Sequence, residues 1–206
     1  MQLDVQTLDQ PLGAIVTGWD PGETLGDSER AEVLGLLQEH VVLVFRGARQ
    51  PEDLELITFA QSFGDLVKGS EWFQDSGAHP EILPVNNLVD EDGVPQGTAG
   101  SEPLGWHSDY SYVPTVGKES FLNAVELPID PPHTYFCDQY TALSTLPSKT
   151  VDMLRPLRAF HSVTKLVSDE EDGNSGYGAG EMKQTQSDFL KKRAHNREKG
   201  VERPRI

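Results

Sequence analysis

The residues best suited to chemistry are His107 and Asp109, which stand two positions apart within residues 106–112. On an extended segment, side chains two positions apart point to the same side, so that the imidazole and the carboxylate can meet. They would supply two ligands of a 2-His-1-carboxylate triad, which holds iron(II) and leaves open positions for a co-substrate and oxygen. The pattern is short and arises easily by chance, so its sequence context decides its meaning.

The composition describes one domain with a sizeable core. The chain has 206 residues, of which 36% are hydrophobic and 24% are charged, as in ordinary globular proteins. No apolar run reaches the length of a membrane span, and the N-terminus lacks the pattern of a signal peptide. Cys137 is the single cysteine, which excludes an internal disulfide and a cysteine-rich zinc site. We therefore expect a cytoplasmic protein.

The net charge of −16 is unevenly distributed. Residues 183–206 contain eight Lys or Arg and three Asp or Glu, so the remainder is strongly acidic. An acidic field repels nucleic acids and anionic lipids, so we expect neither nucleic acid nor membrane as a partner. The basic segment could be a nucleic-acid-binding arm, but a solvated tail is the favoured interpretation.

The first part of the chain alternates strands and helices. Asp27 or Ser28 is expected to cap the first helix, Pro51 to begin the second and Gly64 to end it. The continuous β-branched run at 41–45 predicts a buried strand. The expected elements are strands at 3–8, 14–17 and 41–45 and helices at 27–40 and 51–63.

The remainder is predicted to be mainly β until about residue 165. The expected elements are strands at 82–89, 121–127, 134–137 and 158–163 and a short helix at 147–154. Residues 168–176 are acidic and rich in glycine, and few apolar residues follow. We therefore expect two parts, residues 1–165 as the folded domain and residues 166–206 as a polar, poorly packed segment with at most a helix at 187–196.

Three stretches of this sequence resemble a known family. The first is Val-Val-Leu-Val-Phe-Arg-Gly at 41–47, followed by Phe63-Gly64. The second is Trp-His-Ser-Asp at 106–109, and the third runs from Leu122 to Ser162. In this order they resemble the N-terminal portion of an iron(II)/2-oxoglutarate-dependent dioxygenase of the taurine dioxygenase/TfdA family.

The resemblance implies roles for individual residues. His107 and Asp109 match the first histidine and the carboxylate that bind iron(II), and Asp at 109 suits a hydroxylase. Thr134 matches the threonine whose hydroxyl contacts 2-oxoglutarate, and Trp106 is expected to pack beside the metal-binding strand. One departure precedes Thr134: the family's Gly-Gly-Asp is replaced by Pro-Pro-His at 131–133. Proline cannot adopt the positive φ that glycine allows, so this turn must differ.

Three other histidines and Arg46 are expected to have structural or surface roles and not to bind a metal or a ligand. His161 is expected to be structural, His133 to lie at the surface and His195 to lie in a solvated basic helix. Arg46 could bind an anion, but a turn role after the buried strand is favoured. A metal site completed by one of these histidines is the alternative that the sequence leaves open.

The resemblance also implies residues that this sequence does not supply. The family's second iron histidine and the arginine that pairs with 2-oxoglutarate lie far downstream of the His-x-Asp motif. Neither has a counterpart after Asp109 with suitable context. We therefore expect the distal half of the fold to be missing, which would leave open strand edges.

The sequence therefore predicts an α+β protein built on a double-stranded β-helix (jelly-roll, clavaminate synthase-like) that is incomplete at its C-terminus. The implied activity is iron(II)- and 2-oxoglutarate-dependent hydroxylation of a small organic molecule, such as a sulfonate or a carboxylate, with O2 as co-substrate. The competing interpretation is a non-catalytic short relative or gene fragment. The sequence does not identify the substrate, and a homo-oligomer is left open.

Overall fold

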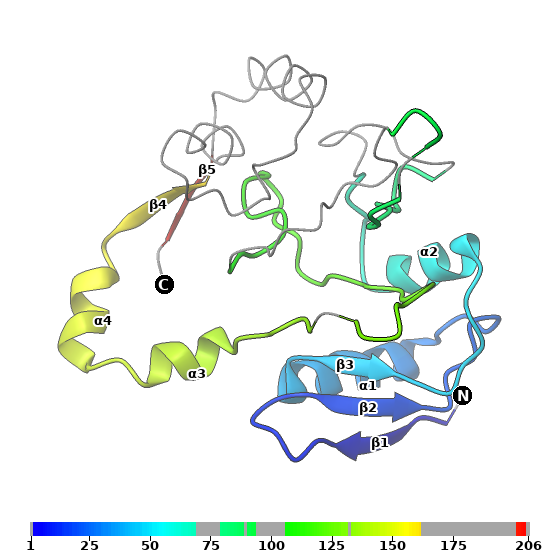
Figure 1. Cartoon of the computed structure of the whole chain (residues 1–206). Coiled ribbons are helices and arrows are strands. Elements are labelled where there is room, and N and C mark those ends of the chain that lie inside the picture. The colour runs from blue at the N-terminus through cyan, green and yellow to red at the C-terminus, as the bar shows by residue number, and fades with distance from the viewer. Residues whose placement is uncertain are drawn as a thin grey trace. The chain divides into compact units, whose positions relative to one another are not determined.

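The computed structural model describes residues 2–68, 79–88, 90–93, 106–131, 133–161 and 201–204 (Figure 1). The chain divides into two compact units. The first comprises Met1–Leu66 and Phe121–Val151, and the second comprises Val67–Ser120 and Asp152–Ile206. The position of one unit relative to the other is not determined.

The first unit contains a three-stranded sheet in the order β1-β2-β3. Strand β1 (Asp4–Thr7) pairs antiparallel with β2 (Ala14–Thr17), and β2 pairs parallel with β3 (Leu43–Phe45). The turn between β1 and β2 ends at Gly13, whose φ of 101° is a conformation that glycine adopts easily. The strand predicted at 14–17 is confirmed with the same bounds, and those predicted at 3–8 and 41–45 are confirmed with shorter ends.

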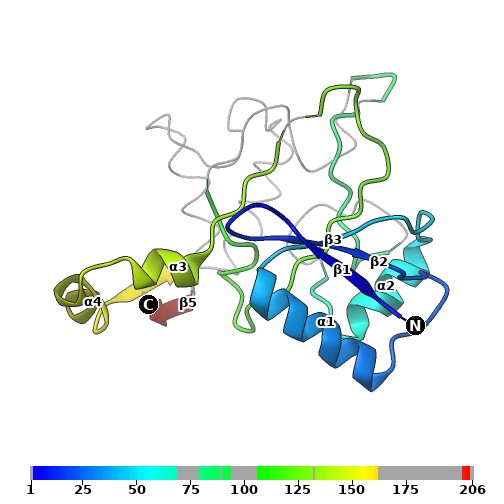
Figure 2. The ribbon, with the colours of Figure 1, turned by 90° about the horizontal axis from the view of Figure 1, so that it is seen from below.

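Helix α1 (Asp27–His40) connects β2 to β3 and lies along one face of the sheet (Figures 1 and 2). Val33 of the helix packs with Leu3 and Val16 in the hydrophobic core. The expected side-chain cap is wrong, because the N-cap is Gly26 and no side chain caps the helix. The acidic residues of the first turn instead lie near the positive end of the helix dipole.

The strand predicted at 41–45 begins two residues late. Val41 has a φ of 67° and its N–H donates to the Leu37 carbonyl oxygen at 2.8 Å. This backbone hydrogen bond closes the end of α1, so Val41 cannot extend as a strand residue. The chain enters β3 at Leu43.

Helix α2 (Asp53–Gln61) is two residues shorter at each end than the helix predicted at 51–63. A capping box at its start joins the Glu52 and Glu55 side chains to the backbone. Pro51 precedes this cap, and Ser62 is the C-cap. Arg46 has the expected place directly after β3, where its N–H donates to the Val16 carbonyl oxygen at 2.9 Å. The three residues of β3 are only partly buried, so the expectation of a fully buried strand was wrong.

The side chain of Phe59 is the centre of an aromatic cluster and is only 7% exposed. Its ring centroid lies 4.7 Å from that of Trp19 and 5.5 Å from that of Phe45. It also lies 5.4 Å from Phe63 and 5.9 Å from Phe121. Edge-on and tilted pairs at these distances are favourable. One residue of α2 therefore packs against the sheet and against the segment that begins at Phe121.

The segment after Phe121 differs from the prediction. The described residues of 121–127 and 134–137 form no strand. Large apolar side chains of this segment remain exposed, including Leu122, Val125 and Leu127. Alternating apolar residues form a strand only when a neighbouring strand pairs with them, and the described part of this unit provides none at these positions.

Two short helices follow this segment. Helix α3 (Gln139–Ser144) was not predicted, although Asp138 caps it by accepting a hydrogen bond from the Tyr140 N–H at 2.9 Å. Helix α4 (Ser148–Leu154) confirms the helix predicted near Pro147.

The second unit contains a two-stranded antiparallel sheet. Strand β4 (Arg158–His161) confirms the predicted strand as far as His161, and residues 162–163 lie outside the described residues. Its partner is β5 (Val201–Pro204), in a region where we expected at most a helix at 187–196. Backbone pairing with β4 stabilises this strand, and a polar sequence does not reveal such a partner. The helix predicted at 187–196 lies outside the described residues.

The strand predicted at 82–89 is wrong for its described residues, 82–88, which form neither helix nor strand.

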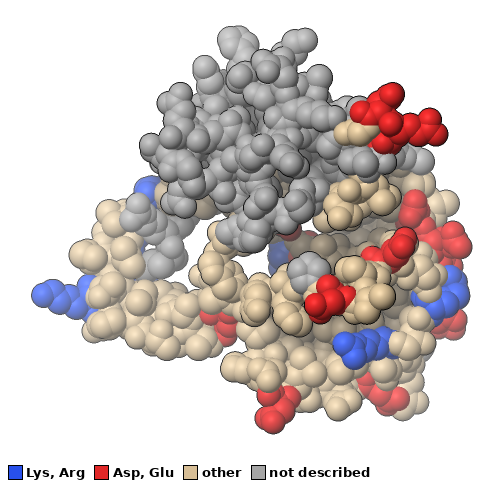
Figure 3. Space-filling model, in the orientation of Figure 1, with Lys and Arg blue, Asp and Glu red and all other residues tan. Residues whose placement is uncertain are grey.

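No helix in the described part of the chain is long and apolar enough to cross a membrane. Figure 3 shows acidic and basic side chains interspersed on one face of the described residues.

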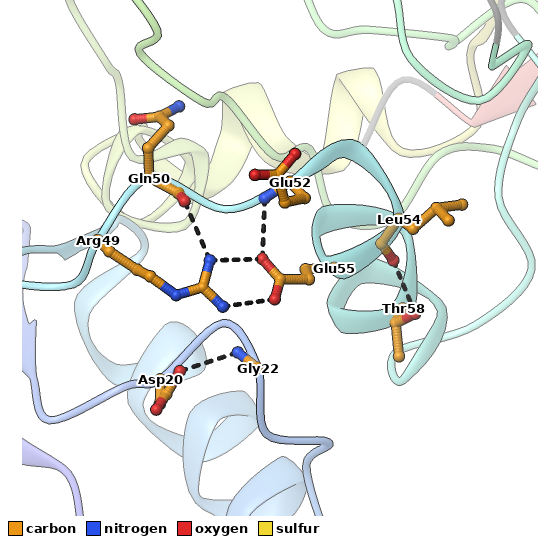
Figure 4. A network of polar contacts seen from close by, with 8 residues as sticks. All are labelled: Asp20, Gly22, Arg49, Gln50, Glu52, Leu54, Glu55 and Thr58. Atoms are coloured by element: carbon orange, nitrogen blue, oxygen red, sulfur yellow. Dashed lines mark hydrogen bonds and ion pairs between the residues drawn. The ribbon is translucent and has the colours of Figure 1, made fainter.

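An ion pair fixes the entry into α2 (Figure 4). The Arg49 guanidinium donates to both carboxylate oxygens of Glu55, at 2.7 and 2.5 Å. The same carboxylate accepts the Glu52 N–H at 2.9 Å. The pKa of Glu55 is lowered to about 2, first by the hydrogen bond from Arg49 and then by the one from Glu52. Asp20 accepts the Gly22 N–H nearby, which shapes the loop before α1.

Phe59→Ala should destabilise the protein strongly, because it leaves a cavity among four aromatic rings. We expect a loss of about 3–5 kcal/mol in the free energy of unfolding, measured by urea denaturation. Leu54→Ala on the same helix is the control, since Leu54 is 64% exposed. Equal losses for the two variants would show that the aromatic cluster does not hold the unit together.

Glu55→Gln should destabilise the protein in a pH-dependent way. The lowered pKa of Glu55 means that its charged form stabilises the fold above pH 4.5, and that this stabilisation is lost as the pH falls toward about 2. The difference in unfolding free energy between the parent protein and Glu55→Gln should therefore shrink over this interval. Glu32→Gln, at an exposed position of α1, is the control. A difference that persists unchanged at the acid end would contradict the ion-pair interpretation.

Candidate metal centre

His107 and Asp109 come together in the second unit. The Nε2 atom of His107 lies 3.3 Å from Oδ1 of Asp109. Their side chains are 37% and 47% exposed, so both are accessible from solvent. An imidazole nitrogen and a carboxylate oxygen therefore converge, as the sequence analysis expected.

The backbone that produces this convergence is a turn and not a strand. Residues 109–112 form a turn, in which the Val113 N–H donates to the Tyr110 carbonyl oxygen at 3.3 Å. Tyr110 has a φ of 51°, which is uncommon for a residue with a Cβ. The expectation of an extended segment was therefore wrong at Asp109, although the two side chains still meet.

The phenol of Tyr110 is half-buried, and its pKa lies above the ordinary value. Burial raises the pKa of Tyr110, and the nearby negative charge of Asp109 raises it further. Its ring centroid lies 6.0 Å from that of Tyr112. Val113 is 5% exposed and is the buried residue that follows the turn. Tyr110, Tyr112 and Val113 are therefore partly or fully buried, while His107 and Asp109 stay accessible.

Two residues outside the turn, Ser120 and His161, contact its side chains. Ser120 Oγ donates to Oδ2 of Asp109 at 3.4 Å, which is a long hydrogen bond. Ser111 Oγ and Nδ1 of His161 are 3.0 Å apart and share a hydrogen bond. Sequence analysis missed both contacts, because no spacing rule connects residues that lie 11 and 50 positions apart.

The donor set suits a divalent metal such as iron(II). Two metal–ligand bonds of about 2.1 Å at a right angle place their donor atoms about 3.0 Å apart. The observed separation of 3.3 Å is close to this value. Among the described residues, no group of three or more His, Cys, Asp or Glu side chains could hold a metal ion. The two residues therefore fit part of a metal site.

The other residues singled out in the sequence have separate outcomes. Thr134 and His133 are exposed residues of the first unit, so their distances to His107 are not determined. His195 lies outside the described residues. Trp106 is 75% exposed, which contradicts the expectation that it packs beside the metal-binding residues.

Comparisons with known proteins agree with the sequence analysis. A family described as "Taurine catabolism dioxygenase TauD, TfdA family" matches residues 4–203. The chain is 40% identical over 153 residues to pentalenolactone F synthase of Streptomyces avermitilis, a match that covers 74% of this chain and 50% of that protein. It is 34% identical over 151 residues to an alpha-ketoglutarate-dependent 2,4-dichlorophenoxyacetate dioxygenase of Cupriavidus pinatubonensis, covering 69% and 52%.

A solved structure is also similar. The crystal structure of AAD-2 in complex with Mn(II) and N-oxalylglycine matches with a TM-score of 0.59 and 22% identity, over 99% of this chain and 66% of that one. At this identity the likeness concerns the fold alone. The chain spans about half the length of the curated relatives described above. The match over residues 4–203 shows that the chain belongs to the TauD/TfdA family.

Proposed function

We propose that this chain is part of an iron(II)- and 2-oxoglutarate-dependent dioxygenase and carries two of its metal ligands. The observation that supports the proposal most directly is the 3.3 Å separation of His107 Nε2 and Asp109 Oδ1 in a member of this family. An imidazole nitrogen and a carboxylate oxygen are two of the three protein donors of the facial triad.

His107, Asp109 and Ser120 have distinct roles in this proposal. His107 binds the metal through Nε2 and Asp109 through a carboxylate oxygen. Ser120 donates to the other carboxylate oxygen and so limits its rotation. Bound iron(II), together with 2-oxoglutarate and O2, supplies the oxidising power needed to hydroxylate an unactivated carbon.

Thr134 is proposed to contact the co-substrate. Its hydroxyl can donate a hydrogen bond to a carboxylate of 2-oxoglutarate. Exposure of Thr134 in the first unit leaves this hydroxyl accessible. The two prolines predicted to alter the preceding turn do not remove the hydroxyl itself.

The proposal requires a third metal ligand and a cationic partner for 2-oxoglutarate. We propose that both belong to the part of the relatives' length that this chain does not span. An arginine there would bind the carboxylate through paired, charge-assisted hydrogen bonds. Experiments on activity therefore require the protein made from the complete reading frame.

The proposed substrate is a small organic molecule, with carboxylates as the first class to examine. The names of several relatives include carboxylates, such as 2,4-dichlorophenoxyacetate and phenoxypropionate. Others are named for sulfate esters. Succinate release measured across carboxylates, sulfonates and sulfate esters would distinguish these classes.

A non-catalytic role is the second candidate. Its support is that the described residues bring together two potential metal ligands and not three. A non-catalytic relative would show no 2-oxoglutarate decarboxylation even when produced from the complete reading frame and supplied with iron(II), ascorbate and the full substrate panel.

Replacing either metal ligand should abolish turnover. In the protein made from the complete reading frame, His107→Ala and Asp109→Ala should each reduce 2-oxoglutarate decarboxylation by at least about 100-fold, because each removes a protein ligand. Succinate release is the measurement. His133→Ala and Asp130→Ala are matched controls at exposed positions of the first unit. Normal turnover in His107→Ala or Asp109→Ala would refute the assignment of that ligand.

Replacing Thr134 should weaken the binding of 2-oxoglutarate and leave metal binding unchanged. Thr134→Val removes a hydrogen bond to a charged group, which corresponds to about 10–100-fold in the KM for 2-oxoglutarate. Thr134→Ser retains the hydroxyl and is the matched control. If the parent protein, Thr134→Val and Thr134→Ser have the same KM for 2-oxoglutarate, Thr134 does not belong to the binding site.

A further inference from the structure

The turn that carries Asp109 needs support from outside itself. Tyr110 has a φ of 51°, a backbone conformation that is unfavourable for a residue with a Cβ. The Val113 N–H donates to the Tyr110 carbonyl oxygen across the turn at 3.3 Å, which is long for a hydrogen bond of this type. Contacts from other parts of the unit must therefore help to hold this conformation.

His161 provides the shorter of the two side-chain contacts described above for the turn. Its Nδ1 lies 3.0 Å from Ser111 Oγ, whereas Ser120 reaches Asp109 at 3.4 Å. A hydrogen bond of 3.0 Å has ordinary length, and one of 3.4 Å is near the limit. The contact of His161 with Ser111 is also partly buried, which strengthens it relative to an exposed one.

The position of His161 is itself fixed by the sheet. His161 is the last residue of β4 and stands opposite Val201 of β5 in the antiparallel register. Pairing with β5 therefore restrains the backbone that carries the imidazole. Ser111 lies two positions after Asp109, so the hydrogen bond connects the sheet to the turn.

We propose that His161 is a positioning residue, which holds the turn of the metal centre through Ser111 and so keeps Asp109 directed toward His107. The proposal rests on the assignment of His107 and Asp109 as metal ligands. A turn that is already ordered binds a metal without the loss of conformational entropy that ordering would require. Loss of the contact should therefore weaken metal binding without removing any ligand.

The test is titration with Mn(II) alone, using the protein made from the complete reading frame and the electron paramagnetic resonance signal of free Mn(II). His161→Leu should raise the Kd for Mn(II) about fivefold, which is the equivalent of one ordinary hydrogen bond. Ser111→Ala should do the same. The double variant should be no weaker than either single variant, because both remove one interaction.

His161→Asn is the rescue variant, since its side-chain amide can occupy the position of Nδ1. It should bind Mn(II) nearly as tightly as the parent protein. His133→Leu is the control for loss of a histidine in the other unit. If His161→Leu does not fold, as judged by circular dichroism, the comparison of Ser111→Ala with Ser111→Thr tests the same contact.

The outcomes separate this inference from the proposed function. If His107→Ala weakens Mn(II) binding and Ser111→Ala and folded His161→Leu do not, the positioning role of His161 is wrong and the metal centre stands. A lower melting temperature with an unchanged Kd would likewise mean that His161 only stabilises β4. If His107→Ala binds Mn(II) as tightly as the parent protein, or no protein binds it, the proposed function fails and this inference fails with it.

Discussion

Burial of Phe59 is the interaction on which the described core of the first unit depends. Its ring contacts Trp19 and Phe45 on the sheet side and Phe121 at the start of the later segment. Residues far apart in the sequence therefore share one apolar cluster, and α2 is the element that joins them. The ion pair between Arg49 and Glu55 complements this packing, because it fixes the start of the helix that presents Phe59.

In the second unit, a backbone turn brings the His107 imidazole and the Asp109 carboxylate together. A turn with a strained residue, Tyr110, directs Asp109 toward His107. Strained backbone of this kind persists only where surrounding contacts hold it, and it is frequent at functional sites. The contact between Ser111 and His161 and the packing of Val113 are such contacts. Membership of the TauD/TfdA family gives this geometry its chemical interpretation.

Local sequence patterns predicted the elements that depend on local interactions. Helices α1 and α2 were predicted from apolar spacing, and α4 was predicted after Pro147. His107 and Asp109 meet as expected, although through a turn and not through the extended segment from which the expectation was argued. Strands at 121–127 and 134–137 were predicted wrongly, because alternation alone does not supply a pairing partner. Strand β5 was not predicted, because its partner β4 lies about forty residues earlier and local sequence patterns do not reveal such a pairing. The turn at Tyr110 also escaped prediction, because tyrosine is not a residue that signals positive φ.

The central claim is that His107 and Asp109 bind a divalent metal, and paramagnetic broadening tests it most directly. Substoichiometric Mn(II) added to the isotopically labelled 206-residue protein would broaden the amide resonances of nuclei close to the bound ion. The account predicts that resonances of residues 106–112 and of Ser120 broaden first, and that Asp109→Ala abolishes this selectivity. Broadening centred on another acidic segment, such as residues 90–92, with residues 106–112 unaffected, would contradict it.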